Sequence, residues 1–375
     1  MTDFTRREFL RRLASGSVAL AGGWLLSACG VQETPAPTAL GPSPTPTALP
    51  PAPTATPPFS QVEPPPPTQA EPPAPTQAEA ASPTQAPPSP TTGATEVPTA
   101  APSAEYPHLA VARGGDPEAM VRRALAAMGG MEQFVSAGDD VIVKPNICVA
   151  YHTYEYAATT NPWVVGALVK LALEAGARRV RVMDYPFGGT PEQAYTRSGI
   201  QEQVQAAGGE MEVMTRLKFV KTDIPQGLDL GKCDIYDQVL NADVLIDVPV
   251  AKHHSLARLT LGMKNLMGLI RDRPAIHRNM GQRLADLTSR VQPTLTVIDA
   301  VRILTAHGPT GGNLDDVAQL DTVIVSPDIV AADSYAATLF GLQPDDLSYI
   351  QAGAAMGLGR SDLSNLKIEE IAVGG

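Results

Sequence analysis

Residues 141–184 read VIVKPNICVAYHTYEYAATTNPWVVGALVKLALEAGARRVRVMD, and this stretch decides the fold. The apolar run Val141–Val143 and the run Val180–Met183 have the length and β-branched content of buried strands. Between them, Pro162–Ala175 has apolar residues at helical spacing, behind Asn161, whose side chain suits the cap of a helix that begins with proline. A strand, a helix and a second strand in this order predict a parallel βαβ unit.

The same alternation continues further along the chain. We expect more strands at Val244–Val248, Leu295–Ile298 and Thr322–Val325. Helices are expected at Pro117–Met128, Pro191–Ala207, Gly281–Arg290, Ile329–Phe340 and Ser348–Met356. The predicted fold class is therefore α/β, with a mostly parallel sheet, helices on both faces and a ligand site at the carboxyl ends of the strands.

The front of the 375-residue chain has a different composition. Most of its 36 prolines fall between Glu33 and Ser103, a segment rich in Ala, Thr and Ser that contains no Lys or Arg. Such a segment cannot bury enough apolar surface to offset its conformational entropy, so it predicts a disordered, extended stalk. We expect three parts: a signal over residues 1–28, the stalk over residues 29–105 and a single α/β domain over residues 106–375.

The N-terminus is typical of an export signal. Arg6 and Arg7 precede Phe9, Leu10 and a mildly apolar stretch, the order seen in twin-arginine signals. The stretch ends Leu-Ser-Ala-Cys at Cys29, which looks like the cleavage and lipidation site of a bacterial lipoprotein. We therefore expect an exported lipoprotein, anchored through Cys29 to the extracytoplasmic face of a membrane. The twin-arginine translocase and the lipoprotein-processing machinery are its expected partners.

Charge and hydropathy exclude two other classes of protein. The chain has 28 basic and 39 acidic residues, a net charge of −11, so it has no general attraction for nucleic acid. No internal run reaches the roughly 18 apolar residues of a spanning helix, which argues against a polytopic membrane protein.

Polar residues follow the predicted strands at the edge where a ligand would bind. Lys144 and Asn146 follow the first strand, Asp184 the second, and Asp299 ends a later one. Residues 247–279 hold most of the concentrated positive charge, together with apolar residues that argue against a fully solvated face. Guanidinium and ammonium groups in a shielded cleft bind carboxylates and phosphates. The predicted ligand-binding residues are Lys144, Asn146, Lys252, Lys264, Asn265 and Arg273.

The histidines leave three interpretations open: proton transfer, metal binding and simple hydrogen-bond donation to a bound anion. His253 and His254 are adjacent, so they face opposite sides of a strand and at most one easily joins His277. As catalytic groups, His253 or His277 would transfer a proton, with Asp299 as the orienting group. The same three residues could instead hold a divalent metal, although no HExxH-like spacing fixes its geometry.

The remaining cysteines give little direct guidance. Cys148 and Cys233 could form a disulfide in an exported protein or stay buried thiols. Two cysteines cannot provide the four ligands of a cubane iron–sulfur cluster. Dinucleotide, phosphate-loop and GxSxG fingerprints are also absent from the sequence.

Several short motifs occur in an order that resembles a known family. They are Val143-Lys144-Pro145-Asn146, Thr160-Asn161-Pro162, Glu174-Ala175-Gly176-Ala177, Val248-Pro249-Val250-Ala251-Lys252-His253-His254, Thr260, Met263-Lys264-Asn265-Leu266-Met267-Gly268, His277, Ile298-Asp299-Ala300 and Gly308-Pro309. The set resembles the family known as domain of unknown function 362, over about residues 106–375. The resemblance implies a fold and a candidate site, but no established reaction. Many relatives carry a ferredoxin-like cluster domain; its cysteine pattern is absent here, so no self-ligated cluster is expected.

Three classes of function remain at this point. The domain could be an enzyme that holds an anionic small molecule and uses proton-transfer or metal-assisted chemistry. It could be a non-catalytic anion-binding module for a membrane partner. It could also be a redox or iron–sulfur-associated accessory protein without its own cluster. We favour an anionic ligand, and an enzyme slightly over a binding module.

Overall fold

The structure is a computed structural model that describes residues 106–374. The features expected at Arg6, Arg7 and Cys29, and the stalk expected over residues 29–105, lie outside the described residues. Among the described helices, none combines the length and apolar character that crossing a bilayer requires.

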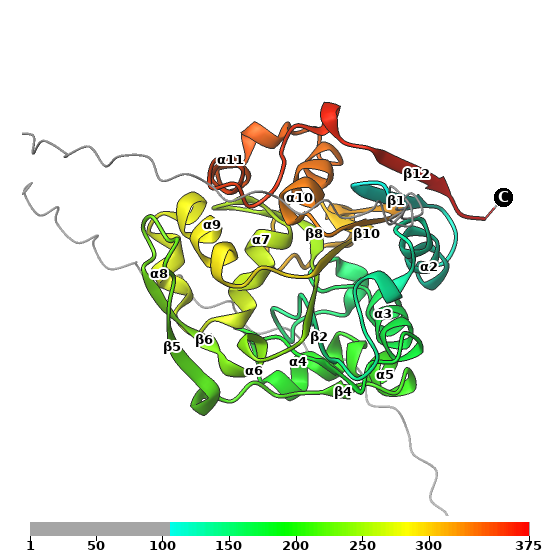
Figure 1. Ribbon diagram of the computed structural model, residues 1–375, viewed down its shortest axis with the longest axis horizontal. Helices are drawn as coiled ribbons and strands as arrows, with labels where there is room; N and C mark the ends of the chain where they lie inside the picture. Colours follow the sequence, from blue (N-terminus) through cyan, green and yellow to red (C-terminus); the bar gives the residue numbers. More distant parts are fainter. Residues whose placement is uncertain (1–105, 375) are drawn as a thin grey trace, which may run out of the picture. The chain divides into compact units, whose positions relative to one another are not determined.

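A mixed sheet forms the centre of the described part of the chain (Figure 1). Its strands are β1 (Leu109–Arg113), β2 (Asp140–Pro145), β3 (Arg179–Val182), β4 (Glu210–Met211), β7 (Val244–Val248), β8 (Val250–His254), β9 (Arg258–Thr260), β10 (Leu295–Leu304), β11 (Val317–Ser326) and β12 (Ile368–Ala372). The order across the sheet is β12-β1-β11-β10-β7-β2-β3-β4, with β8 paired to β10 and β9. Strands β10, β7, β2, β3 and β4 are parallel, whereas β11 is antiparallel to β1 and β10. A separate antiparallel pair is formed by β5 (Phe219–Asp223) and β6 (Lys232–Tyr236).

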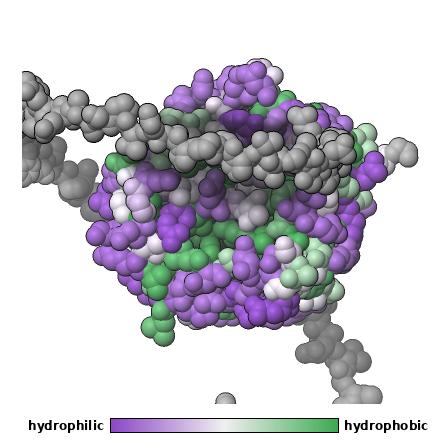
Figure 2. Space-filling view, viewed as in Figure 1, coloured by the Kyte–Doolittle hydropathy of each residue, from purple (hydrophilic) through white to green (hydrophobic). Residues whose placement is uncertain are grey.

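Helices cover both faces of the sheet. The first face packs against α2 (Pro117–Ala127), α3 (Pro162–Glu174), α4 (Pro191–Arg197) and α5 (Ile200–Ala206). The second packs against α6 (Asp237–Leu240), α7 (Gly262–Asn265), α8 (Arg273–His277), α9 (Met280–Arg290), α10 (Ile329–Thr338) and α11 (Ser348–Ala355). Side chains alternate across β2 as strand geometry requires, because Val141 and Val143 join the first core and Ile142 the second. On the face of the molecule seen in Figure 2, hydrophilic residues surround an apolar area.

The structure confirms the predicted fold class. The strand predicted at Val141–Val143 is part of β2 and lies between two parallel neighbours. These are β3, predicted at Val180–Met183, and β7, predicted at Val244–Val248. The predicted helix caps are also present: Asn161 accepts a hydrogen bond from the Trp163 backbone N–H, and Thr190 accepts one from the Gln193 N–H. Local sequence was sufficient here because the caps and the apolar spacing agree with the tertiary packing.

Several elements differ from the sequence prediction. The helix expected over residues 191–207 breaks into α4 and α5 at Gly199, whose φ of 77° lies in the left-handed region. Strands β1, β4, β5, β6, β8, β9 and β12 were not predicted. The last three carry charged or histidine side chains among few apolar ones, so period-2 alternation is weak in their sequences.

Candidate functional site

A cavity of about 420 Å³ opens beside the carboxyl ends of β2 and β3. Residues at and just after these two strands form one part of its wall. The rest of the wall comes from β8, β9, α7, the short 3₁₀ turn Leu266–Leu269 that follows α7, and α8. These segments come from four separate parts of the sequence. The site therefore lies where a ligand is expected in an α/β sheet.

The structure brings all six predicted ligand-binding residues to this cavity. Its lining includes Lys144, Asn146, Lys252, Lys264, Asn265 and Arg273. Three buried lysines and a partly buried arginine thus surround one space, in a protein whose net charge is negative.

Lys144 is fully buried and uses all its hydrogens within the protein. Its Nζ contacts Asn265 Oδ1 at 2.7 Å, the Pro145 carbonyl at 3.0 Å and Asp184 Oδ1 at 3.0 Å. Burial lowers the pKa of Lys144 below its ordinary value, and the nearby Asp184 and Asp247 carboxyl groups oppose this effect. Lys144 is therefore a structural cation that fixes the floor of the cavity.

Asn265 links the groups beneath the cavity. Its Oδ1 accepts hydrogen bonds from Lys144 and from Asn146 Nδ2, and its Nδ2 donates to Asp247 Oδ1 at 2.9 Å and to the Lys144 carbonyl. Burial raises the pKa of Asp247 well above its ordinary value, against the effect of the Lys144 charge. With four bonds made, this amide orients the cations rather than being free for a ligand.

Lys252 is also fully engaged. Its Nζ donates to the Ala158 carbonyl at 2.6 Å, to Asn146 Oδ1 at 2.9 Å and to Cys148 Sγ at 3.3 Å. An ammonium group has three hydrogens to donate, so these contacts account for all of them. Lys252 adds positive charge to the cavity but has no donor left for a ligand.

Lys264 differs from the other two lysines. Its side chain is only 8% exposed, and within residues 106–374 its Nζ has one hydrogen-bond contact, to Met267 Sδ at 3.7 Å. A thioether is a weak acceptor, so this buried amine is largely without a partner. Burial, followed by the charges of Lys252 and Arg273, lowers the pKa of Lys264 to about 7.

Arg273 forms the side of the cavity next to two aromatic rings. Its Nε donates to the Met267 carbonyl at 3.1 Å and its Nη2 to the Tyr185 carbonyl. The guanidinium carbon lies 5.4 Å from the ring centre of Tyr185 and 5.8 Å from that of Phe187. Among the described residues Nη1 has no hydrogen-bond partner, so this nitrogen is available to an anion in the cavity.

His254, and not His253, lines the cavity. The two alternate along β8, so His254 shares the face of Lys252 while His253 points to the other side, where its Nδ1 accepts the Gly308 N–H at 3.1 Å. His254 Nδ1 accepts the backbone N–H groups of Leu256 and Ala257. Sequence reasoning missed His254; its separation of two residues from Lys252 would have indicated it, had β8 been predicted.

The hydrogen bonds of His254 determine how it can act. Because both partners of Nδ1 are backbone donors, Nδ1 must carry a lone pair, and the proton of the neutral ring sits on Nε2. Burial, followed by the Lys264 and Lys252 charges, lowers the pKa of His254 to about 3. His254 is therefore a neutral hydrogen-bond donor at ordinary pH, and is poorly suited to accept a proton.

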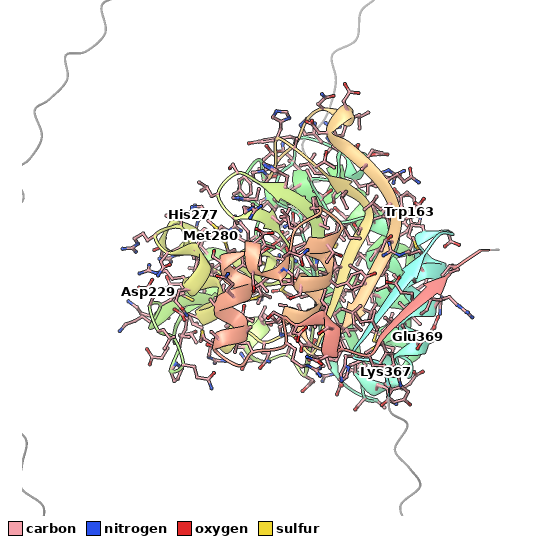
Figure 3. The ribbon with its side chains drawn as sticks, turned by 90° about the horizontal axis from the view of Figure 1, so that it is seen from above. Trp163, Asp229, His277, Met280, Lys367 and Glu369 are labelled. Atoms are coloured by element: carbon pink, nitrogen blue, oxygen red, sulfur yellow. The ribbon has the colours of Figure 1, made fainter. Side chains whose placement is uncertain are left out.

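The other predicted catalytic residues do not form one group. His277 is exposed at the end of α8 and lies at the edge of the molecule near Met280 (Figure 3), where it reaches the cavity rim. Asp299 is buried away from the cavity lining and accepts the backbone N–H groups of Asn161 at 2.6 Å and Val301 at 3.1 Å. Its contacts fix the start of α3 to β10, which is a structural role.

The residues expected to hold a metal are also apart. Within residues 106–374, no group of three His, Cys, Asp or Glu side chains is placed to hold a metal ion. Cys148 and Cys233 are both buried free thiols, so the structure does not pair them. Cys148 lines the cavity beside Lys252, whereas Cys233 lies in the core on β6.

Comparison with known proteins identifies the family. The family described as domain of unknown function (DUF362) matches residues 141–338, which is more than half of the chain. The protein belongs to the DUF362 family. The matched region includes every lysine, asparagine and arginine of the predicted ligand site.

One relative and two solved structures can be compared with this DUF362 protein. A thylakoid-associated protein of Synechocystis sp. (strain ATCC 27184 / PCC 6803 / Kazusa) is 26% identical over 255 residues, which cover 64% of this chain and 75% of the relative. The lactate racemase apoprotein of Thermoanaerobacterium thermosaccharolyticum has a TM-score of 0.39 and 12% identity, covering 61% of this chain and 56% of that one. A protein from Thermotoga maritima has a TM-score of 0.34 and 14% identity, covering 60% of each chain.

Proposed function

We propose that the α/β domain binds an anionic small molecule, a carboxylate or a phosphate, in the cavity beside β2 and β3. The observation that carries this proposal is the state of Lys264, a buried amine whose one contact within the described residues is the Met267 thioether. An unpaired buried cation costs several kcal/mol, and a bound anion would remove most of that cost.

Four donors at the cavity wall support the same ligand class. Lys264 Nζ, Arg273 Nη1, His254 Nε2 and the Thr260 hydroxyl line the cavity, and the described residues supply none of them with a strong acceptor. The carboxyl groups in the neighbourhood do not compete, because Asp184 is paired with Lys144, and Asp247, which bonds Asn265 through Oδ1, does not line the cavity. A site with free donors and no free acceptor selects an anion.

The apolar part of the wall limits the shape of the ligand. Tyr185, Phe187, Leu256 and Met267 line the cavity beside the donors. Phe187 and Leu256 are among the exposed large apolar side chains, so they border the entrance. The site therefore suits an anion that carries a small apolar or planar group.

Isothermal titration calorimetry of the full-length protein with oxalate and with inorganic phosphate tests this function. We expect one site per chain for at least one of the two, and at least tenfold weaker binding to the Lys264→Met variant. Lys221→Met is the matched control, because Lys221 is an exposed lysine on β5. Absence of binding to the wild-type protein, or equal binding by the wild type and Lys264→Met, would refute the proposal.

We also propose that this domain is held at a membrane through a lipid on Cys29, after export by the twin-arginine route. The paired Arg6 and Arg7 and the lipobox-like ending before Cys29 support this localisation. The relative from Synechocystis is named as a thylakoid-associated protein, and this name agrees with a membrane-linked role. The anion site would then face the compartment outside the cytoplasm.

A further inference from the structure

The same cavity holds an amine that is able to react, and this inference rests on the proposed anion site. A lysine adds to a carbonyl carbon only as the neutral amine, so its nitrogen must be free of strong acceptors that hold the ammonium form. Of the three lysines that line the cavity, Lys144 and Lys252 each donate to three acceptors, an arrangement that requires the ammonium. Within the described residues, Lys264 has only the Met267 thioether.

Burial and the charges near Lys264 keep part of its population neutral. With a pKa of about 7, roughly half of the Lys264 side chains lack the extra proton at neutral pH. Burial is the largest cause of this lowered pKa, and the cations that add to it, Lys252 and Arg273, are the groups that would attract a carboxylate. A buried amine beside other cations is a recognised way of preparing a lysine for covalent chemistry.

The remaining donors can hold a carboxylate while Lys264 reacts. Arg273 stays charged at physiological pH and has Nη1 free among the described residues, and His254 presents a neutral Nε2–H. The Thr260 hydroxyl, 3% exposed and without a hydrogen-bond partner in the described part of the chain, lines the same cavity. These groups would bind the carboxylate and the carbonyl oxygen of one small ligand.

We propose that Lys264 forms a reversible imine with a small carboxylate that carries an adjacent aldehyde or ketone, such as a 2-oxo acid. The neutral Nζ attacks the carbonyl carbon to give a carbinolamine. Loss of one water molecule, made of the carbonyl oxygen and the two amine hydrogens, then leaves a carbon–nitrogen double bond between Lys264 and the ligand. No oxidant, reductant or metal enters this step, and hydrolysis reverses it.

Reductive trapping tests this assignment. The full-length protein is incubated with pyruvate, and separately with glyoxylate, in the presence of sodium cyanoborohydride, which reduces an imine to a stable secondary amine. We expect intact-mass spectrometry to show one added ligand per chain with at least one of the two probes, and peptide mapping to place it on Lys264. Lys264→Arg should reduce the adduct at least tenfold, and Lys221→Arg should leave it unchanged.

The outcomes separate this inference from the proposed function. Oxalate has no reactive carbonyl, so its binding reports the anion site alone. Oxalate or phosphate binding without an adduct on Lys264 would overturn the imine while leaving the anion site in place. An adduct spread equally over surface lysines would also overturn it. Peptide mapping of the wild-type protein shows whether the adduct is on Lys264 even if the Lys264→Arg variant does not fold.

Discussion

The Asp333 carboxylate, on α10, accepts the backbone N–H of Gly262 at 2.6 Å, across 71 positions of the sequence. Its second oxygen accepts the Met263 N–H at 3.0 Å. These bonds fix the start of α7, the four-residue helix that carries Lys264 and Asn265. A short helix has little stability of its own, so Asp333 positions the site from outside it.

Asp333→Asn should weaken the site by loosening α7. The asparagine amide has one acceptor oxygen, so it can accept only one of the two backbone N–H groups of Gly262 and Met263. Its NH₂ group would face the other N–H, and two donors cannot bond to each other. We expect the free energy of unfolding to fall by about 1–3 kcal/mol, with weaker oxalate binding. Urea unfolding and calorimetry measure the two effects. The control is Asp345→Asn, at an exposed position, which should change neither quantity. An unaltered affinity in Asp333→Asn would contradict this positioning role.

Lys264→Met should stabilise the protein in the absence of ligand. The folded-state pKa of about 7 lies below the ordinary 10.5, so between these values the unfolded chain binds more protons and stability rises with pH. At about pH 7 the variant should gain roughly 1–3 kcal/mol over the wild type, and the gain should shrink towards about pH 9. Urea unfolding at both pH values checks this. A loss of stability in Lys264→Met at neutral pH would contradict this prediction, because it would mean that the buried amine stabilises the folded protein.

Oxalate affinity should fall as the pH rises through 7. Binding needs the Lys264 ammonium, and the affinity should drop by up to about tenfold per pH unit above its pKa. The pKa values of His254 and His277 are lowered, to about 3 for His254, so neither ring titrates above neutrality. Calorimetry between about pH 6 and about pH 8 measures the slope. Lys264→Arg should flatten it, because a guanidinium stays charged; a steep slope in that variant would assign the effect to another group.

Gly268→Ala should disrupt the floor of the cavity. A Cβ at this position would overlap Asp184 Oδ1 and lie 2.5 Å from Lys144 Nζ, which would force apart their buried ion pair. Breaking a buried pair costs about 3–5 kcal/mol. Gly231→Ala is the matched control, since a Cβ there meets no atom within 4 Å. Thermal unfolding should separate the two variants clearly, and equal melting temperatures would refute the predicted overlap.

Cys29→Ser should release the protein from the membrane. Without the thiol there is no site for the lipid that is proposed to hold the chain at the membrane. When the source cells are fractionated, the variant should appear in the soluble extracytoplasmic fraction and no longer in the membrane fraction. Replacing both Arg6 and Arg7 with lysine should instead retain the precursor inside the cell. If Cys29→Ser stays in the membrane fraction, the anchor lies elsewhere.

The sequence by itself determined the α/β class, the parallel centre of the sheet and six of the residues that line the cavity. It could do so because strand lengths, the caps at Asn161 and Thr190, and polar residues after each strand are local features. Lys144 and Asn146 reach the cavity because they lie at the carboxyl end of β2, whereas the other four predicted ligand residues are brought there by β8, α7 and α8.

Only the tertiary structure decided what each of these residues does. Lys144, Lys252 and Lys264 are alike in sequence. Folding surrounds the first two nitrogens with three acceptors each, which makes them structural, and gives Lys264 only a thioether among residues 106–374. The face of β8 likewise brings His254 into the cavity and turns His253 away. Pairing and burial depend on contacts between distant segments, so no local pattern could reveal them.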